Sequence, residues 1–145
     1  MNPLLRLWRL PSEERQLLFG AVALVTAVRI GVSVCGLGRL RRALSRLSPR
    51  RVEIPLSSER IGWAVRAAAQ RVPGARTCLV QALAAETLLA RHGHVAQLRI
   101  GVARAGAGIE AHAWLEQNGQ PVFGQPSPMD HALLPLLPPV EVRGR

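Results

Sequence analysis

The sequence contains no lysine and no tyrosine, and aromatic residues make up 3% of its 145 positions. With so few rings, the hydrophobic core has to be built mainly from aliphatic side chains. All 19 basic residues are arginines; they outnumber the 9 acidic residues and give a formal net charge of +10. Such a charge attracts acidic peptides, anionic lipids or nucleic acids. Because no aromatic residues are interleaved with the arginines and no groove-reading motif is present, we do not expect a nucleic-acid-binding protein.

The chain has only two cysteines, Cys35 and Cys78, so it has no framework of disulfides. This count fits a reducing, cytoplasmic environment. Cys35 lies inside an apolar run and is expected to be inert. His92 and His94 are close in sequence, but without a matching cysteine or carboxylate pair they do not predict a metal site. We therefore expect neither a metal nor a cofactor.

An apolar stretch over residues 17–37 has about the ~20 residues that a bilayer core requires. No cleavage site of a signal peptide follows it. Arg29 inside the run argues against a membrane span, since an arginine at mid-span costs about 2.5–3.5 kcal/mol. We expect a buried or peripheral helix capped by Ser12, with a spanning helix as the alternative. The basic residues 39–51 predict an amphipathic helix, either solvated and packed on the first one or in contact with anionic lipid or an acidic partner.

Helical periodicity returns after a break at residues 49–58, in a helix that Ser57 or Ser58 caps and that ends near Arg71. The next helix begins at Cys78, is apolar on nearly all sides, and is expected to end at Gly93. After Gly93 the apolar residues recur at every second position instead of at helical spacing. This alternation predicts strands at residues 95–102, 111–117 and 121–124, a flexible loop at 105–108, and a two-residue hairpin turn at 118–119.

Helices followed by an antiparallel sheet give an α+β fold. We expect a helical arm over residues 1–52 and a core over residues 53–145, in which a central helix packs on a small antiparallel sheet. The proline- and leucine-rich tail, residues 125–145, is expected to wrap the surface or cap the sheet.

Cys78 and His112 are the candidate catalytic pair. Cysteine attacks as a thiolate, which the unpaired N–H groups and partial positive charge of a helix N-terminus favour. A histidine on a following strand can take the thiol proton. Either residue alone is more often structural. Their joint placement, one at a helix start and one on the sheet, indicates a nucleophile and its base.

The order of these segments resembles the transglutaminase-like cysteine peptidases that remove the leader from lasso peptide precursors. The resemblance covers most of the chain and includes residues 10–29, 78–83 (CLVQAL), 88–93 (LLARHG), 98–102 (LRIGV) and 111–116 (AHAWLE). It implies a papain- or transglutaminase-like core, with Cys78 as nucleophile and His112 as base in peptide-bond hydrolysis.

The same resemblance implies a place in the maturation of a ribosomally made, post-translationally modified bacterial peptide. The short chain implies the split arrangement, in which a separate small winged-helix-like protein binds the leader of the lasso precursor and this chain cuts. An asparagine-synthetase-like cyclase would then use the freed core peptide. The expected location is the cytoplasm, with peripheral contact to the inner membrane face through the helical arm.

The third catalytic residue departs from the family pattern. The triad is usually completed by an Asp at the position that Gly124 occupies here. In a regular hairpin, His112 would face Gln125, whose side-chain amide can orient the ring. Gln125 is therefore the predicted third residue, with Asp130 and then Glu116 as alternatives. A Cys–His dyad that has no third residue also stays open.

The oxyanion of the reaction needs hydrogen-bond donors, and the backbone N–H of Cys78 is the natural one. Gln81, one turn into the helix, is either a substrate contact or an exposed polar residue. Trp114 shares a strand face with His112 and either walls the cleft or fills the core. Two other functions stay open: a transglutaminase-like acyl transferase or amide-modifying enzyme, and a non-catalytic scaffold that binds the precursor.

Overall fold

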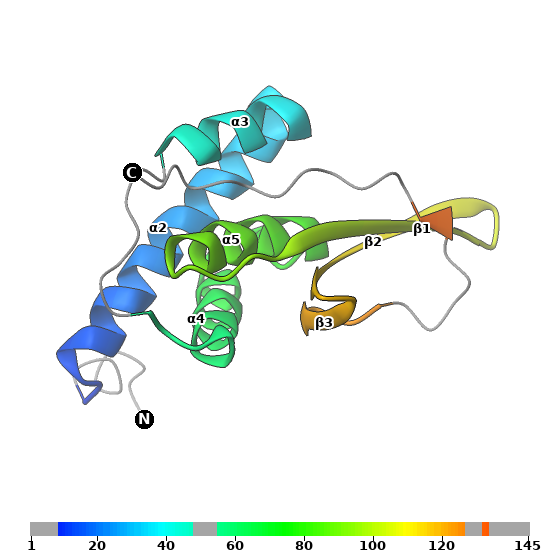
Figure 1. Cartoon of the computed structure of the whole chain (residues 1–145). Helices are drawn as coiled ribbons and strands as arrows, with labels where there is room; N and C mark the ends of the chain where they lie inside the picture. The colour runs from blue at the N-terminus through cyan, green and yellow to red at the C-terminus, as the bar shows by residue number, and fades with distance from the viewer. Residues whose placement is uncertain (1–8, 48–54, 127–131, 134–145) are drawn as a thin grey trace.

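The computed structural model describes residues 9–47, 55–126 and 132–133. In these residues the helices α2 (Ser12–Cys35), α3 (Leu37–Leu47), α4 (Ser58–Arg71) and α5 (Cys78–Arg91) precede the strands β1 (Gln97–Ala105), β2 (Gly108–Gln117), β3 (Gln120–Phe123) and β4 (Ala132–Leu133). The strands form one antiparallel sheet in the order β3-β2-β1-β4. Figure 1 shows the β1–β2 hairpin reaching away from the helices. The predicted α+β fold class is confirmed.

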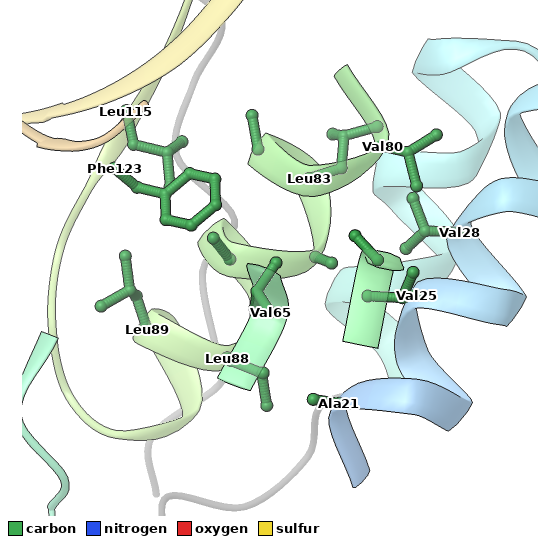
Figure 2. Close-up of a cluster of buried hydrophobic side chains, with 14 of the residues drawn as sticks. Ala21, Val25, Val28, Val65, Val80, Leu83, Leu88, Leu89, Leu115 and Phe123 are labelled. Carbon is green, nitrogen blue, oxygen red and sulfur yellow. The ribbon is translucent and has the colours of Figure 1, made fainter. Parts of the chain in front are cut away.

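Helix α5 is the centre of the molecule, because all its residues from 82 to 89 are buried. Helices α2 and α4 pack on it from one side and the sheet from the other. Figure 2 shows Val25 and Val28 of α2 beside Val80 of α5, and Leu115 and Phe123 arriving from β2 and β3. The cluster is almost entirely aliphatic, as the scarcity of aromatic residues predicts. Each valine, leucine or isoleucine side chain fully buried here contributes about 1.5–3 kcal/mol relative to exposure, and each of the many alanines contributes less.

Helix α2 places one face in this core and leaves the other uncovered. Its buried residues recur every three or four positions, as a helix face requires: Leu18, Ala21, Val25 and Val28. On the opposite face, Phe19, Ile30 and Val34 are 65%, 58% and 75% exposed. By length and composition alone α2 is apolar enough to cross a membrane. In the fold, one of its faces belongs to the hydrophobic core and the other is exposed.

Arg29 does not interrupt this packing, because its guanidinium lies over the turn that joins α4 to α5. A Cβ atom at Gly74 would stand 2.7 Å from Arg29 Nε, and Gly74 has a φ of +74°. The same guanidinium donates to Ser33 one turn further along α2. The glycine therefore makes room for an arginine that would otherwise have to leave the interface.

Helix α3 is tied to α5 by a buried ion pair. Arg41 Nη2 lies 2.6 Å from Glu86 Oε1, and the two side chains are 10% and 1% exposed. Leu40 and Leu44 join the same core cluster. The predicted helix after the first one is thereby confirmed, although its last expected residues, 48–51, lie outside the described part of the chain. The division into an arm and a core at residue 52 stays a prediction; the described helices on both sides of it share one hydrophobic core.

Two histidines fix the entry to α4. The N–H of Leu56 donates to His92 Nδ1 at 3.1 Å, and His94 Nε2 donates to the carbonyl of Leu56 at 2.7 Å. His92 caps α5 and Gly93, at a φ of +81°, reverses the chain directly after it. The described residues contain no group of three or more His, Cys, Asp or Glu side chains that could hold a metal ion.

Two local predictions differ from the structure. The cap of α2 is Pro11, with no side-chain hydrogen bond, rather than Ser12, which is already helical. Residues 105–108 are not a flexible loop, because Ala105 pairs with Gly108 across a two-residue turn. Gly106 makes this turn possible at a φ of +57°. The tail contributes the short strand β4, which pairs with the middle of β1; residues 127–131 and 134–145 lie outside the described part of the chain.

Candidate active site

Cys78 is the first residue of α5, where the helix leaves N–H groups without intrahelical acceptors. The first backbone bond of the helix runs from Gln81 N to Thr77 O at 3.2 Å. The N–H groups of residues 78–80 therefore stand outside the ladder. Thr77 makes no side-chain cap, and the first turn contains no acidic residue. This end of α5 offers donors and partial positive charge beside the thiol, which suits an oxyanion and a thiolate.

The thiol of Cys78 lies against β2 next to His112. Cys78 Sγ is 3.9 Å from the carbonyl oxygen of Ala111, to which the thiol donates. Since that carbonyl directly precedes His112, the sulfur is within roughly 7 Å of the His112 Cα. Both side chains are half-buried. Proton transfer to the ring requires the thiol to leave the carbonyl, and such catalytic hydrogen bonds commonly form only once substrate is bound.

The His112 ring is held on its edge and on its face. Its Nε2 lies 2.6 Å from the main-chain carbonyl oxygen of Gln125. A carbonyl only accepts hydrogen bonds, so Nε2 carries the proton, and Nδ1 of the neutral ring has its lone pair available. The face of the ring stacks on Trp114, with centroids 6.1 Å apart and planes 26° apart. The fold thus selects the tautomer of His112 that is protonated at Nε2.

Gln125 reaches His112 by a different atom from the one predicted. The side-chain amide was expected to orient the ring, and the main-chain carbonyl occupies that place. The hairpin register is not regular: Gln117 pairs with Gln120 as predicted, but a β-bulge follows and β3 ends at Phe123. Gly124, at a φ of +72°, then turns the chain back toward the ring. The extra residue of the bulge redirects the backbone there.

Of the other two candidates for the third residue, only Glu116 lies in the described part of the chain. Asp130 lies outside the described residues. Glu116 accepts a hydrogen bond from Trp114 Nε1 at 2.8 Å and lies 3.5 Å from Arg99 Nε. Its carboxylate therefore holds the tryptophan that supports the His112 ring. Trp114 itself is 4% exposed, so it fills the interior and stacks on His112 at once.

Gln81 braces the loop that leads to Cys78. Its Nε2 donates to the carbonyl of Arg76 at 3.0 Å. It also lines a cavity of about 300 Å³ together with four residues of α4 and the following loop: Arg66, Ala69, Gln70 and Arg76. No sequence signal singles out the two arginines, which resemble any solvated arginine of this basic chain. Cys35, the other free cysteine, is exposed at the end of α2 and far along the chain from this loop.

A comparison with known families gives a match over most of the chain. The model of a family described as the transglutaminase-like superfamily matches residues 22–134. The chain belongs to the transglutaminase-like superfamily. The matched region of this transglutaminase-like chain includes both Cys78 and His112. Comparisons with curated proteins and with solved structures return no match. The superfamily includes cysteine peptidases and acyltransferases, so the fold suggests acyl transfer through a cysteine.

Proposed function

We propose that this protein is a cysteine peptidase that removes the leader from a lasso peptide precursor. The observation that supports the chemistry best is the position of the Cys78 thiol, beside the strand residue next to His112. A second is the tautomer of His112, whose Nε2 is occupied by the Gln125 carbonyl. Membership of a superfamily that includes cysteine peptidases supports the assignment of Cys78 and His112 as the active site.

The reaction follows from these groups. His112 takes the thiol proton, and the Cys78 sulfur bonds to the carbonyl carbon at the leader–core junction. The N–H of Cys78 stabilises the oxyanion. The carbon–nitrogen bond then breaks, and the imidazolium of His112 gives its proton to the departing core amine. Water, activated by His112, adds to the thioester and releases the leader carboxylate and the free thiol.

The proposed substrate and partners come from the motifs at residues 78–83 and 111–116, which resemble those of lasso leader peptidases. A small winged-helix-like protein would bind the leader and present the junction to Cys78. The freed core amine would pass to an asparagine-synthetase-like cyclase. The net charge of +10 favours peptides and partners with acidic surfaces.

The test uses the full chain with its precursor and leader-binding partner, since the isolated chain is not expected to cut efficiently. Mass spectrometry follows the appearance of free leader and core. Cys78→Ala and His112→Ala should each reduce the rate by at least about a thousandfold. Cys35→Ala removes the other thiol and should leave the rate unchanged. Undiminished leader removal by Cys78→Ala or His112→Ala would reject the assignment.

One alternative keeps the same acyl-enzyme and changes the acceptor from water to an amine. Mass spectrometry distinguishes the two, because an acyl transferase gives an intact, mass-shifted precursor and a peptidase gives two fragments. A non-catalytic scaffold is favoured by Gly124, which stands where the family has an Asp. Alkylation by iodoacetamide near neutral pH decides this point: a Cys78 that reacts no faster than a small free thiol favours the scaffold.

A further inference from the structure

The cavity beside Cys78 has the lining of an anion site. Arg66, Ala69 and Gln70 lie at helical spacing on one face of α4, and Arg76 and Gln81 complete the lining. Two guanidiniums and two amides line an open cavity of about 300 Å³, and the described lining contains no acid. Neither arginine forms an ion pair with any described acidic residue. A bound carboxylate would provide the negative charge that this lining does not have.

The guanidinium of Arg66 is positioned before any ligand arrives. Its central carbon lies 5.3 Å from the centroid of the Phe123 ring, a cation–π contact. Gly62, one turn earlier, makes room for it, because a Cβ there would stand 3.3 Å from Arg66 Nη2 and from the Phe123 ring. A guanidinium held in this way loses less conformational entropy when it binds a carboxylate.

The cavity is within reach of the reacting bond. Arg76 is two residues before Cys78, and Gln81 is three residues after it, on the first turn of the same helix. The N-terminal end of α5, which has no acidic residue in its first turn, adds to the positive potential. An extended peptide advances about 3.3–3.6 Å per residue, so the substrate residues that approach Arg76 and Gln81 are those close to the scissile bond.

We propose that this cavity is a substrate subsite that binds the carboxylate of a Glu or Asp close to the cleavage point. The proposal rests on the function proposed above, because it assumes that a peptide lies across Cys78. Bidentate contact with one guanidinium and hydrogen bonds from the two amides would fix the register of the peptide. The subsite would therefore select where the chain is cut.

Binding is measured with the inactive Cys78→Ala protein, so that it does not depend on cleavage. The probes are fluorescein-labelled decapeptides of alanine and serine that contain one Glu at each position in turn, with matched Gln peptides. We expect a Glu peptide to bind at least about tenfold more tightly than its Gln partner at one or two adjacent positions. Arg66→Gln and Arg76→Gln should each reduce that preference, and the double variant should abolish it. Arg39→Gln, with the same loss of charge on α3, should preserve it.

Cleavage of precursors with Glu or Gln near the junction is measured in parallel with the active protein. If the protein cuts its precursor but binds Glu and Gln peptides equally, the subsite is overturned and the proposed peptidase function is retained. A Glu preference that depends on Arg66 and Arg76, in a chain that cuts nothing, supports the subsite and overturns the peptidase. If Arg39→Gln and Arg66→Gln lower the preference for Glu peptides equally, the preference comes from general electrostatic attraction, and the subsite is overturned.

A different observation concerns the uncovered face of α2. Phe19, Ala23, Ala27, Ile30 and Val34 follow one another at helical spacing opposite the core, and all are exposed. Helix α3 begins directly after the turn at Gly36 and contains no acidic residue. Its exposed side chains include Arg39, Arg42 and Arg46. An exposed apolar helix face followed by a helix with exposed arginines is the pattern of a helix pair that rests on an anionic lipid surface.

We infer that α2 and α3 bind the surface of an anionic bilayer. Flotation is measured with vesicles of phosphatidylcholine alone and with 30% phosphatidylglycerol, at low and at physiological salt. The protein should float only with the anionic vesicles, and more at low salt. Phe19→Ser with Ile30→Ser, or Arg39→Gln with Arg42→Gln, should abolish flotation. Ile109→Ser, an equally apolar exposed site on β2, should leave it unchanged.

Circular dichroism confirms that each variant is folded before flotation is compared. Absence of flotation by the wild-type protein overturns the inference. So does a dimer, seen by light scattering, that Phe19→Ser with Ile30→Ser dissociates, since the face would then belong to a second protein chain. Flotation that persists in both variants also overturns it.

Discussion

The Nε2 atom of His112 donates to the main-chain carbonyl of Gln125 at 2.6 Å, so the backbone itself stands where a triad carboxylate would be. A carbonyl orients the ring and selects its tautomer. Being neutral, it stabilises the imidazolium less than a carboxylate does. The side chain of Gln125 is exposed and has no part in this bond.

The first prediction separates the backbone of Gln125 from its side chain. Gln125→Ala retains the carbonyl and should change the rate of leader removal by less than about threefold, because no bond to the ring is lost. A loss comparable to that of His112→Ala would show that the amide acts directly. Rates are compared by single-turnover cleavage of the precursor.

The second prediction concerns Gly124, whose backbone conformation directs the Gln125 carbonyl toward His112. Gly124→Ala should destabilise the protein by about 1–2 kcal/mol because of its φ of +72°. It should also slow cleavage, since the new Cβ would stand 3.2 Å from the Cβ of Trp114 and displace the chain at Gln125.

Gly119→Ala is the matched control for this change. Gly119 has a φ of +76°, and a Cβ atom added there would meet no other atom within 4 Å, so the strain is similar and no neighbour has to move. We expect a similar loss of stability by urea unfolding and an unchanged cleavage rate. Equal rates for Gly124→Ala and Gly119→Ala would contradict the positioning role of Gly124.

The third prediction concerns the tryptophan beneath the ring. Trp114→Ala should cost about 3–5 kcal/mol of stability, because it empties a buried site. Trp114→Phe keeps a ring for His112 to stack on and loses the bond to Glu116, at a cost of about 1 kcal/mol. If stacking supports catalysis, the Phe variant should cut much faster than the Ala variant at a temperature where both are folded. Unfolding is followed by circular dichroism; equal rates would mean that Trp114 only fills space.

The fourth prediction concerns the buried pair of Arg41 and Glu86. Glu86→Leu should destabilise the fold by about 3–5 kcal/mol, because it leaves a buried guanidinium without its carboxylate. Adding Arg41→Met should recover most of that loss, measured by urea unfolding.

The exposed pair of Arg60 and Glu14 is the control. Their side chains are 44% and 31% exposed at a separation of 3.2 Å. Glu14→Gln should cost less than about 1 kcal/mol, and less still in high salt. For the buried pair, the contrary outcome is a double variant, Glu86→Leu with Arg41→Met, whose free energy of unfolding is no higher than that of Glu86→Leu alone. The ion pair itself would then stabilise the core.

The elements were predictable because their side-chain periods are visible in the sequence. The cap at Ser57, the helix from Cys78 and the turn at residues 118–119 are confirmed. The bulge in the third strand was missed, since an extra residue changes the register without changing the alternation of apolar and polar residues near a short strand. For the same reason the contact of Gln125 was assigned to the wrong atom: a sequence pattern describes side chains, and this bond is made by the main chain.

The cavity beside Cys78 was not predictable, because Arg66 and Arg76 come from different elements. In a chain whose basic residues are all arginine, neither position stands out. The turn between α4 and α5 brings them to one cavity, with Arg76 two residues before Cys78 in the chain. The role of Glu116 was equally hidden, because its partner Arg99 lies on the neighbouring strand. Such groupings depend on tertiary packing and not on local sequence.

The two-residue turn between β1 and β2 lies at the far end of a hairpin whose outer residues, 104–111, are all exposed. Apart from Ala111, whose carbonyl accepts a hydrogen bond from the Cys78 thiol, these residues add no buried side chain to the core, so the tip at residues 105–108 should tolerate insertions and deletions. We expect natural homologues to differ in length there. A label attached at residue 107 should therefore leave the stability of the fold unchanged.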